Sequence, residues 1–324
     1  MKRPIFPLAF CLAASAYAQN ASTPPVTMEK KPSQLNVAVV SMKSVYSDSP
    51  DAAENAKNIQ ANISRHLYFI DKLAAQGAEF IGFPEASING YHYSPNMTWL
   101  KLDGPEMEAI KKKAREKSVY VGVGIAEVDP EGKHWEAQAV IGPDGKIVGV
   151  QRKSWLTKEK GFIESSTDHN VFGVKGTKMG ITICADGTDF RNLKALTDGG
   201  AKIIYAPHAN TTGGTTEGWY KFRSRWVGPF DETATPSKVA DDSMVDMPAG
   251  GWIAGLKVYA ILNNHAGLFN PDFSPPAGED KLAGWASGTL IIGPDGVILA
   301  QKPSSNSKTD TAEFISTYSI PLGS

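Results

Sequence analysis

The sequence repeats a short pattern in its two halves, and this echo limits the folds that the chain can adopt. The segment GAEFIGFPEA at 77–86 matches GAKIIYAPHA at 200–209 at one fixed offset. The pentapeptide IGPDG stands at 141–145 and again at 292–296. Each half thus carries an apolar strand followed by a hairpin, with amphipathic helical segments around them. Two halves of this plan predict two sheets packed face to face with helices outside.

The N-terminus has the layout of a secretory signal peptide. A positive start (KR), an apolar stretch and a small-x-small cleavage site, AYA at 16–18, follow one another. We therefore expect residues 1–18 to be removed and the mature protein to be periplasmic or secreted. Residues 19–34, rich in Ser, Thr, Pro and Lys, are predicted to be a disordered lead-in.

Charge and hydropathy exclude two classes of partner. The formal charge of the 324 residues is -1, which argues against a nucleic-acid partner and against a polybasic membrane contact. No apolar run reaches the length of a membrane span, so we expect no membrane partner after signal cleavage.

One cysteine stands out once the signal peptide is removed. Cys11 is removed with the signal peptide, so Cys184 is the single thiol of the mature chain. Exported proteins normally pair their cysteines or avoid them. A β-branched run predicts a buried strand that ends at Cys184. The helix predicted after it would favour the thiolate through its dipole. The alternative is a buried structural cysteine.

A thiol nucleophile needs a base and a group that stabilises an oxyanion. None of the six histidines has papain-like surroundings, so a Cys/His protease is disfavoured. Glu85 follows a predicted strand and Pro84, and a desolvated carboxylate can act as a general base. Lys153 is a third ionisable residue at a strand end. Taken alone, the carboxylate could be a cap or ion-pair partner and the lysine could be solvated.

Three segments together resemble the nitrilase superfamily of carbon–nitrogen hydrolases: FPE at 83–85, RK at 152–153 and KMGITICAD at 178–186. They stand in the family order Glu, Lys, Cys. The resemblance covers residues 35–305 and leaves 306–324 as a C-terminal extension. It implies a four-layer α-β-β-α sandwich with internal pseudo-two-fold symmetry, and a homodimer or higher homo-oligomer.

The resemblance also implies the site. Glu85, Lys153 and Cys184 form the triad, with Glu85 as base and with Lys153 and the Ala185 N–H as oxyanion donors. Glu159, in an EKGF segment similar to the family's Glu-Lys-x-x-Phe, is expected to be the second glutamate, with Glu164 as the fallback. This chemistry requires neither a metal nor an organic cofactor. Three further residues lie just past strand ends and are predicted to line the pocket: Tyr91, His208 and Asn210.

Ala185-Asp186 after the cysteine favours the amidase or carbamoyl-amidase branch, because nitrile-cleaving members tend to carry Trp-Glu there. We therefore expect an exported cysteine amidohydrolase that cleaves a small linear amide or N-carbamoyl compound through a thioester. A nitrilase that converts a nitrile to an acid and ammonia is the first alternative. A non-catalytic binding or assembly protein on the same scaffold is the second. The long polar segment 211–251 is predicted to be a lid or a partner-binding arm.

Overall fold

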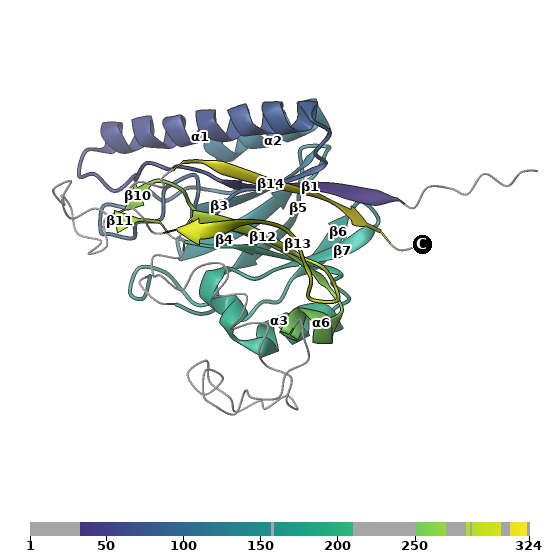
Figure 1. The fold of residues 1–324 in the computed structure, drawn as a ribbon. Helices are drawn as coiled ribbons and strands as arrows, with labels where there is room; N and C mark the ends of the chain where they lie inside the picture. Colours follow the sequence, from purple (N-terminus) through teal and green to yellow (C-terminus); the bar gives the residue numbers. More distant parts are fainter. Residues whose placement is uncertain are drawn as a thin grey trace, which may run out of the picture. The chain divides into compact units, whose positions relative to one another are not determined.

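The computed structural model of the protein describes residues 33–156, 159–209, 251–269, 283–285, 287–305 and 312–322. Within these ranges two six-stranded sheets face each other, and helices cover the outer face of each sheet (Figure 1). The predicted α-β-β-α sandwich is thereby confirmed. The predicted signal peptide and all but the last two residues of the lead-in lie outside the described residues. So does the segment 211–251, apart from Gly251 at its end.

The first sheet comes mainly from the first half of the chain and has the strand order β14-β1-β2-β3-β4-β5. Its strands are β1 (Gln34–Ser41), β2 (Phe80–Gly82), β3 (Tyr120–Val128), β4 (His134–Ile141), β5 (Ile147–Arg152) and β14 (Phe314–Pro321). Strands β1, β2 and β3 are parallel, whereas β3–β4 and β4–β5 are antiparallel pairs. As a result, β2, β3 and β5 all run in one direction and end at the same edge of the sheet.

The second sheet repeats this plan, with the order β13-β12-β9-β8-β7-β6. Its strands are β6 (Val171–Val174), β7 (Thr177–Ile181), β8 (Ile203–Pro207), β9 (Tyr259–Asn263), β12 (Ser287–Ile292) and β13 (Ile298–Ser305). Strands β7, β8 and β9 are parallel, and β9–β12 and β12–β13 are antiparallel, as in β1 to β5. The two Gly-Pro-Asp-Gly turns match as well, with φ of 80° at Gly145 and 79° at Gly296. The predicted internal pseudo-two-fold symmetry is confirmed. A two-stranded ribbon, β10 (Leu268–Phe269) with β11 (Ala283–Gly284), stands apart from both sheets.

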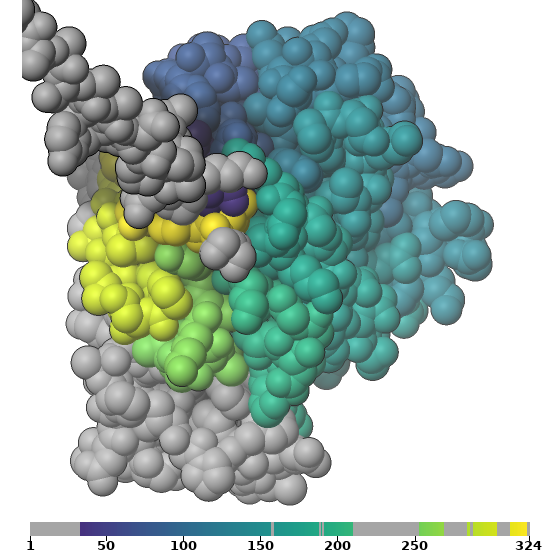
Figure 2. Space-filling model, turned by 90° about the vertical axis from the view of Figure 1, so that its right-hand side faces the viewer, coloured from purple at the N-terminus to yellow at the C-terminus, as the bar shows by residue number. Residues whose placement is uncertain are grey.

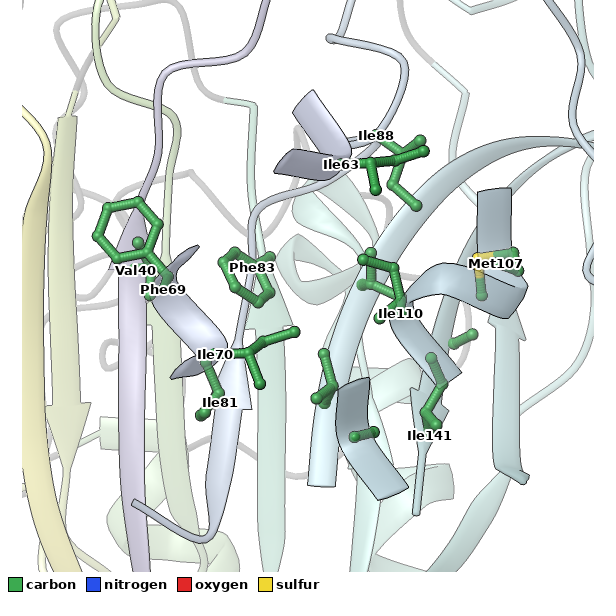
Figure 3. Close-up of a cluster of buried hydrophobic side chains, with 14 of the residues drawn as sticks. Val40, Ile63, Phe69, Ile70, Ile81, Phe83, Ile88, Met107, Ile110 and Ile141 are labelled. Carbon is green, nitrogen blue, oxygen red and sulfur yellow. The ribbon is translucent and has the colours of Figure 1, made fainter. Parts of the chain in front are cut away.

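Amphipathic helices close the sandwich on both sides. Helices α1 (Ala52–Ala75) and α2 (Pro105–Lys117) lie on the first sheet, and α3 (Phe190–Asp198) and α6 (Gly251–Leu256) lie on the second (Figure 1). Helix α1 begins where the Asp51 side chain accepts the Ala53 N–H at 2.9 Å, and it buries Ile63 and Ile70 against the sheet (Figure 3). No helix in the described ranges is long and apolar enough to cross a membrane.

Strand β1 shows why each sheet is apolar on both faces. Val37 and Val39 point into the core between the sheets, whereas Ala38 and Val40 pack under the helices. Successive side chains of a strand alternate between its faces, so a strand between two apolar layers is apolar throughout. This explains the continuous apolar run at the start of the domain.

The end of the chain belongs to the first sheet, so the domain boundary predicted at residue 305 is wrong. Strand β14 pairs antiparallel with β1 along its whole length, from Gln34↔Pro321 to Ser41↔Phe314. The start and the end of the described chain therefore lie side by side (Figure 2). The sequence beyond 305 lacks a long apolar run because only alternate residues of this edge strand, such as Ile320, are buried.

Candidate active site

Glu85 lies past the end of β2, after Phe83 and Pro84, and its side chain is fully buried. The backbone around Glu85 is held by two contacts from the second sheet. Tyr205 of β8 donates a hydrogen bond to the Phe83 carbonyl, and His265 Nε2 lies 2.7 Å from the Glu85 carbonyl oxygen. Ala86 then takes the left-handed conformation, with φ of 46°. These contacts hold the carboxylate at the C-terminal edge of the sheet.

Lys153 directly follows β5, and its ammonium group is the centre of the site. Its Nζ contacts Glu85 Oε1, lies 2.6 Å from Glu159 Oε1 and lies 3.5 Å from Glu136 Oε2. Burial alone would lower the pKa of this lysine, but the surrounding carboxylates outweigh that effect and raise the pKa well above its usual value. Lys153 is therefore a permanent cation. The three carboxylate oxygens gathered around it lie within 4.8 Å of one another.

Glu159 reaches this cluster and Glu164 does not. Glu159 is fully buried and accepts hydrogen bonds from Lys153 and from the Tyr91 hydroxyl. Burial alone would raise the pKa of Glu159, but Lys153 and the Tyr91 hydroxyl lower it by more than burial raises it, to about 2. Glu164 is exposed. The sequence-based preference for Glu159 therefore agrees with the contacts.

Glu136 of β4 is the carboxylate that the sequence analysis missed. Its side chain is 1% exposed, and its carbonyl oxygen accepts the Lys153 N–H at 2.9 Å. This pairing lies beyond a β-bulge, since the register of β4 and β5 shifts between Val140 and Ile141 before Ala137 pairs with Arg152. In the sequence, Glu136 alternates with Ala137 and Ala139 in a strand that is buried on both faces. This alternation is the signal for a charged group directed into the interior.

Cys184 faces this cluster from the second sheet, three residues beyond β7. It is partly exposed, has φ of 46° and opens a five-residue 3-10 helix, η1 (Cys184–Thr188). Burial of the thiol and the Glu85 charge raise its pKa well above the usual value; Lys153 and a hydrogen bond from the Ala209 N–H lower it by less. The expected stabilisation of a thiolate by a helix N-terminus is therefore wrong. The helix α3 begins only at Phe190, and burial is the largest cause that raises the pKa of the thiol.

Asp186 connects the cysteine loop to the lysine loop. Its carboxylate accepts the N–H of Trp155 at 2.6 Å and that of Ser154 at 3.1 Å. Burial is the main cause that raises its pKa, to about 6. The residues after Lys153 are thus tied to the residues after Cys184, which fixes the two side chains relative to each other.

The four residues predicted around the triad have different outcomes. Tyr91 is at the site: its ring lies 5.5 Å from Lys153 Nζ, and its hydroxyl donates a hydrogen bond to Glu159. Ala185 follows Cys184 in η1, and its role as an oxyanion donor stays a prediction. His208 is buried just past β8, where Nδ1 lies 2.8 Å from the Ala206 carbonyl oxygen. Asn210 lies outside the described residues.

The family follows from a comparison with known proteins. A family model described as carbon-nitrogen hydrolase matches residues 36–323. This chain belongs to the carbon–nitrogen hydrolase family. The match runs through β14, in agreement with the place of that strand in the first sheet. The predicted nitrilase superfamily is confirmed, but the branch within it is not fixed by this match.

Curated relatives of the chain include enzymes with different reactions. A cyanide hydratase of Alternaria brassicicola is 31% identical over 111 residues, which span only 30% of this chain and 30% of that relative. The omega-amidase NIT2 of Homo sapiens is 27% identical over 194 residues, which cover 56% of this chain and 70% of the amidase. A cyanide hydratase of Gibberella zeae is 28% identical over 256 residues, with 67% and 70% covered.

Solved structures share the fold over nearly the whole chain. Nit3 of Saccharomyces cerevisiae, a member of branch 10 of the nitrilase superfamily, superposes with a TM-score of 0.63 at 18% identity, covering 90% of this chain and 92% of Nit3. An amidase from Nesterenkonia sp. gives a TM-score of 0.63 at 15% identity, with 91% and 93% covered. At these identities the likeness shows the fold alone.

Proposed function

We propose that this hydrolase is a cysteine-dependent amidohydrolase that cleaves a small linear amide or an N-carbamoyl compound. The observation that carries the proposal is the buried contact of Lys153 with Glu85 and Glu159, next to the thiol of Cys184. A nucleophile, a base and a permanent cation are the groups that acyl transfer requires. An amidase from Nesterenkonia sp. in variant form carries the acetamide moiety of fluoroacetamide covalently at its active-site cysteine, which supports the same chemistry here.

The first step is proton removal from the thiol. Because burial and Glu85 raise the pKa of Cys184, the resting residue is a thiol and needs a base. Glu85 Oε1 is held by Lys153, whereas Glu85 Oε2 has no hydrogen-bond partner among the described residues. Oε2 is the oxygen that accepts the Sγ proton while Sγ bonds to the carbonyl carbon of the amide.

The remaining steps return the proton and release the acyl group. The tetrahedral oxyanion is stabilised by Lys153 and the Ala185 N–H, and loss of one such donor typically raises the barrier by about 2.7–4 kcal/mol. Glu85 then gives its proton to the leaving amine as the C–N bond breaks, which leaves a thioester on Cys184. Water, deprotonated by Glu85, attacks the thioester, and the thiol regains its proton as the acid leaves.

A nitrilase that converts a nitrile to an acid and ammonia is the second candidate, because cyanide hydratases and an arylacetonitrilase are among the relatives. Ala185-Asp186 after the cysteine, in place of Trp-Glu, favours the amidase. A non-catalytic binding protein on the same scaffold is disfavoured, since an unused thiol, base and cation have no reason to be packed together.

The deciding experiment combines thiol labelling with substrate assays on the purified mature protein. We expect iodoacetamide to modify Cys184, with a pH profile that changes in both Glu85→Gln and Lys153→Ala, and ammonia release from amides to exceed that from the matching nitriles. A profile indifferent to both substitutions would mean a structural cysteine, and a preference for nitriles would select the second candidate.

We also propose that the protein is exported and acts as a homodimer. The KR start, the apolar stretch and the AYA site support removal of residues 1–18. The intact mass of the protein recovered from the periplasm or medium tests the cleavage. Light scattering at micromolar concentration tests the dimer; a monomer at that concentration would contradict it.

A further inference from the structure

The buried cluster holds more carboxylates than its single cation can neutralise. Lys153 supplies one positive charge, whereas Glu85, Glu136 and Glu159 are each at most 1% exposed. Burying an uncompensated carboxylate is costly, and such a group retains a proton instead. At least one of the three carboxyl groups is therefore expected to be protonated in the resting protein.

The contacts indicate which one it is. Glu159 accepts from both Lys153 and Tyr91, and Glu85 is in direct contact with the ammonium group. Glu136 has the longest contact with Lys153, 3.5 Å, and its Oε1 has no hydrogen-bond partner among the described residues. It is the carboxylate that the cation stabilises least.

The groups that face Glu136 from the neighbouring elements favour the same assignment. Glu85 from the end of β2 and Glu159 from the loop after Lys153 add negative charge, and Lys153 adds positive charge. Tyr91 and Tyr93, from the loop after β2, are neutral phenols whose pKa values burial raises well above the usual value. Burial and then the Glu85 charge also raise the pKa of Glu136 well above its usual value.

We propose that Glu136 is a positioning residue that keeps a proton and donates it in a hydrogen bond to Glu85, so that this bond and Lys153 together orient the base toward Cys184. The inference rests on the proposed role of Glu85 as the base. The geometry brings the two side chains together, because carboxylate oxygens of Glu85, Glu136 and Glu159 all lie within 4.8 Å of one another. Glu136 exchanges no atoms with the substrate, because its proton stays in place while Glu85 Oε2 accepts the proton of the Cys184 thiol.

The first test needs no substrate, so it stays informative if the amidase proposal fails. Infrared spectra at pH 8, where Asp186 with its pKa of about 6 is ionised, should show the C=O stretch of a buried carboxylic acid in the wild type. The band should be lost or clearly reduced in Glu136→Gln and kept in Glu131→Gln, a matched control at an exposed glutamate of the β3–β4 turn. No band in the wild type, or an equal band in Glu136→Gln, would overturn the proposal.

The second test asks whether the donor or the charge of Glu136 matters. Glutamine keeps a donor for Glu85 and no charge, so Glu136→Gln should alkylate at Cys184 within a few-fold of the wild-type rate, with the same pH profile. Alanine removes the donor and should slow alkylation about 10-fold or more and shift the profile. Equal losses in both variants, or no loss in Glu136→Ala, would contradict the assignment. If Glu136→Ala does not fold, the alkylation rate of Glu136→Gln and the infrared spectra still test whether Glu136 holds a proton.

Discussion

At the scale of single residues, the site depends on one buried lysine. Lys153 is 1% exposed and contacts three carboxylates on different segments of the chain. A buried ion pair gives little net stability compared with an apolar pair, but removal of one partner leaves the other charge buried and unpaired. The same residue is therefore required for stability and for the proposed oxyanion site.

Replacement of Lys153 by Met should lower the free energy of unfolding by about 3–5 kcal/mol at neutral pH. The loss should depend on pH. Lys153 holds the pKa of Glu159 at about 2, below the value of about 4.3 in the unfolded chain, so this stabilisation is complete above the unfolded pKa and disappears as the pH falls toward 2. The deficit of Lys153→Met should accordingly shrink below pH 4.

Urea denaturation at pH 7 and at lower pH measures this effect, with Lys133→Met, at an exposed lysine of the β3–β4 turn, as the control. A deficit that is constant across pH would mean that the lysine acts through packing of its alkyl chain and not through its charge.

At the scale of elements, the two sheets meet closely because glycines leave room for one aromatic ring. Tyr205 of β8 lies against Gly82 and Gly122 of the opposite sheet, where a Cβ would come within 2.9 Å and 2.5 Å of its ring atoms. The same tyrosine donates to the Phe83 carbonyl, two residues before Glu85. The spacing of the sheets and the position of the base are thus set by one contact.

Gly122→Ala should therefore cost about 1–3 kcal/mol of unfolding free energy, through overpacking of a close-packed core. We also expect a slower alkylation of Cys184, because displacement of Tyr205 moves the segment that carries Glu85. Gly173→Ala is the matched control, since a Cβ on that strand glycine meets no atom within 4 Å. Thermal denaturation of both variants checks the prediction, and equal melting temperatures would refute it.

At the scale of the whole molecule, the fold is closed by its last strand. Strand β14 covers the open edge of β1, and Ile320 and Leu322 join the core between the sheets at 0% and 7% exposure. An uncovered edge strand leaves a row of unpaired backbone groups that promotes association.

Truncation after Ser305 should then destabilise the protein by more than about 3 kcal/mol, because full burial of each large aliphatic side chain contributes roughly 1.5–3 kcal/mol. We expect the shortened protein to be aggregated or unfolded by circular dichroism. Truncation after Leu322, which keeps β14 whole, should leave the melting temperature unchanged. If a chain that ends at residue 305 is soluble and folds cooperatively, the domain boundary predicted from the sequence at residue 305 is correct.

Sequence patterns were sufficient for the architecture and pointed to the candidate site. The repeated strand and hairpin segments predicted the two-sheet sandwich, whereas Glu85, Lys153 and Cys184 were predicted from three strand ends together with their resemblance to the nitrilase superfamily. Such features are readable because alternation, turn residues and strand ends are properties of neighbours in the chain.

Only the tertiary structure decided the features that depend on distant pairs. The contact of Glu136 with Lys153 follows from hairpin register, and the hydrogen bond from Tyr91 to Glu159 joins segments that lie 68 residues apart. The place of β14 depends on β1, at the other end of the domain. The raised pKa of Cys184 is a result of desolvation, and desolvation exists only after the sheets have packed, because no local pattern records how much water a side chain loses.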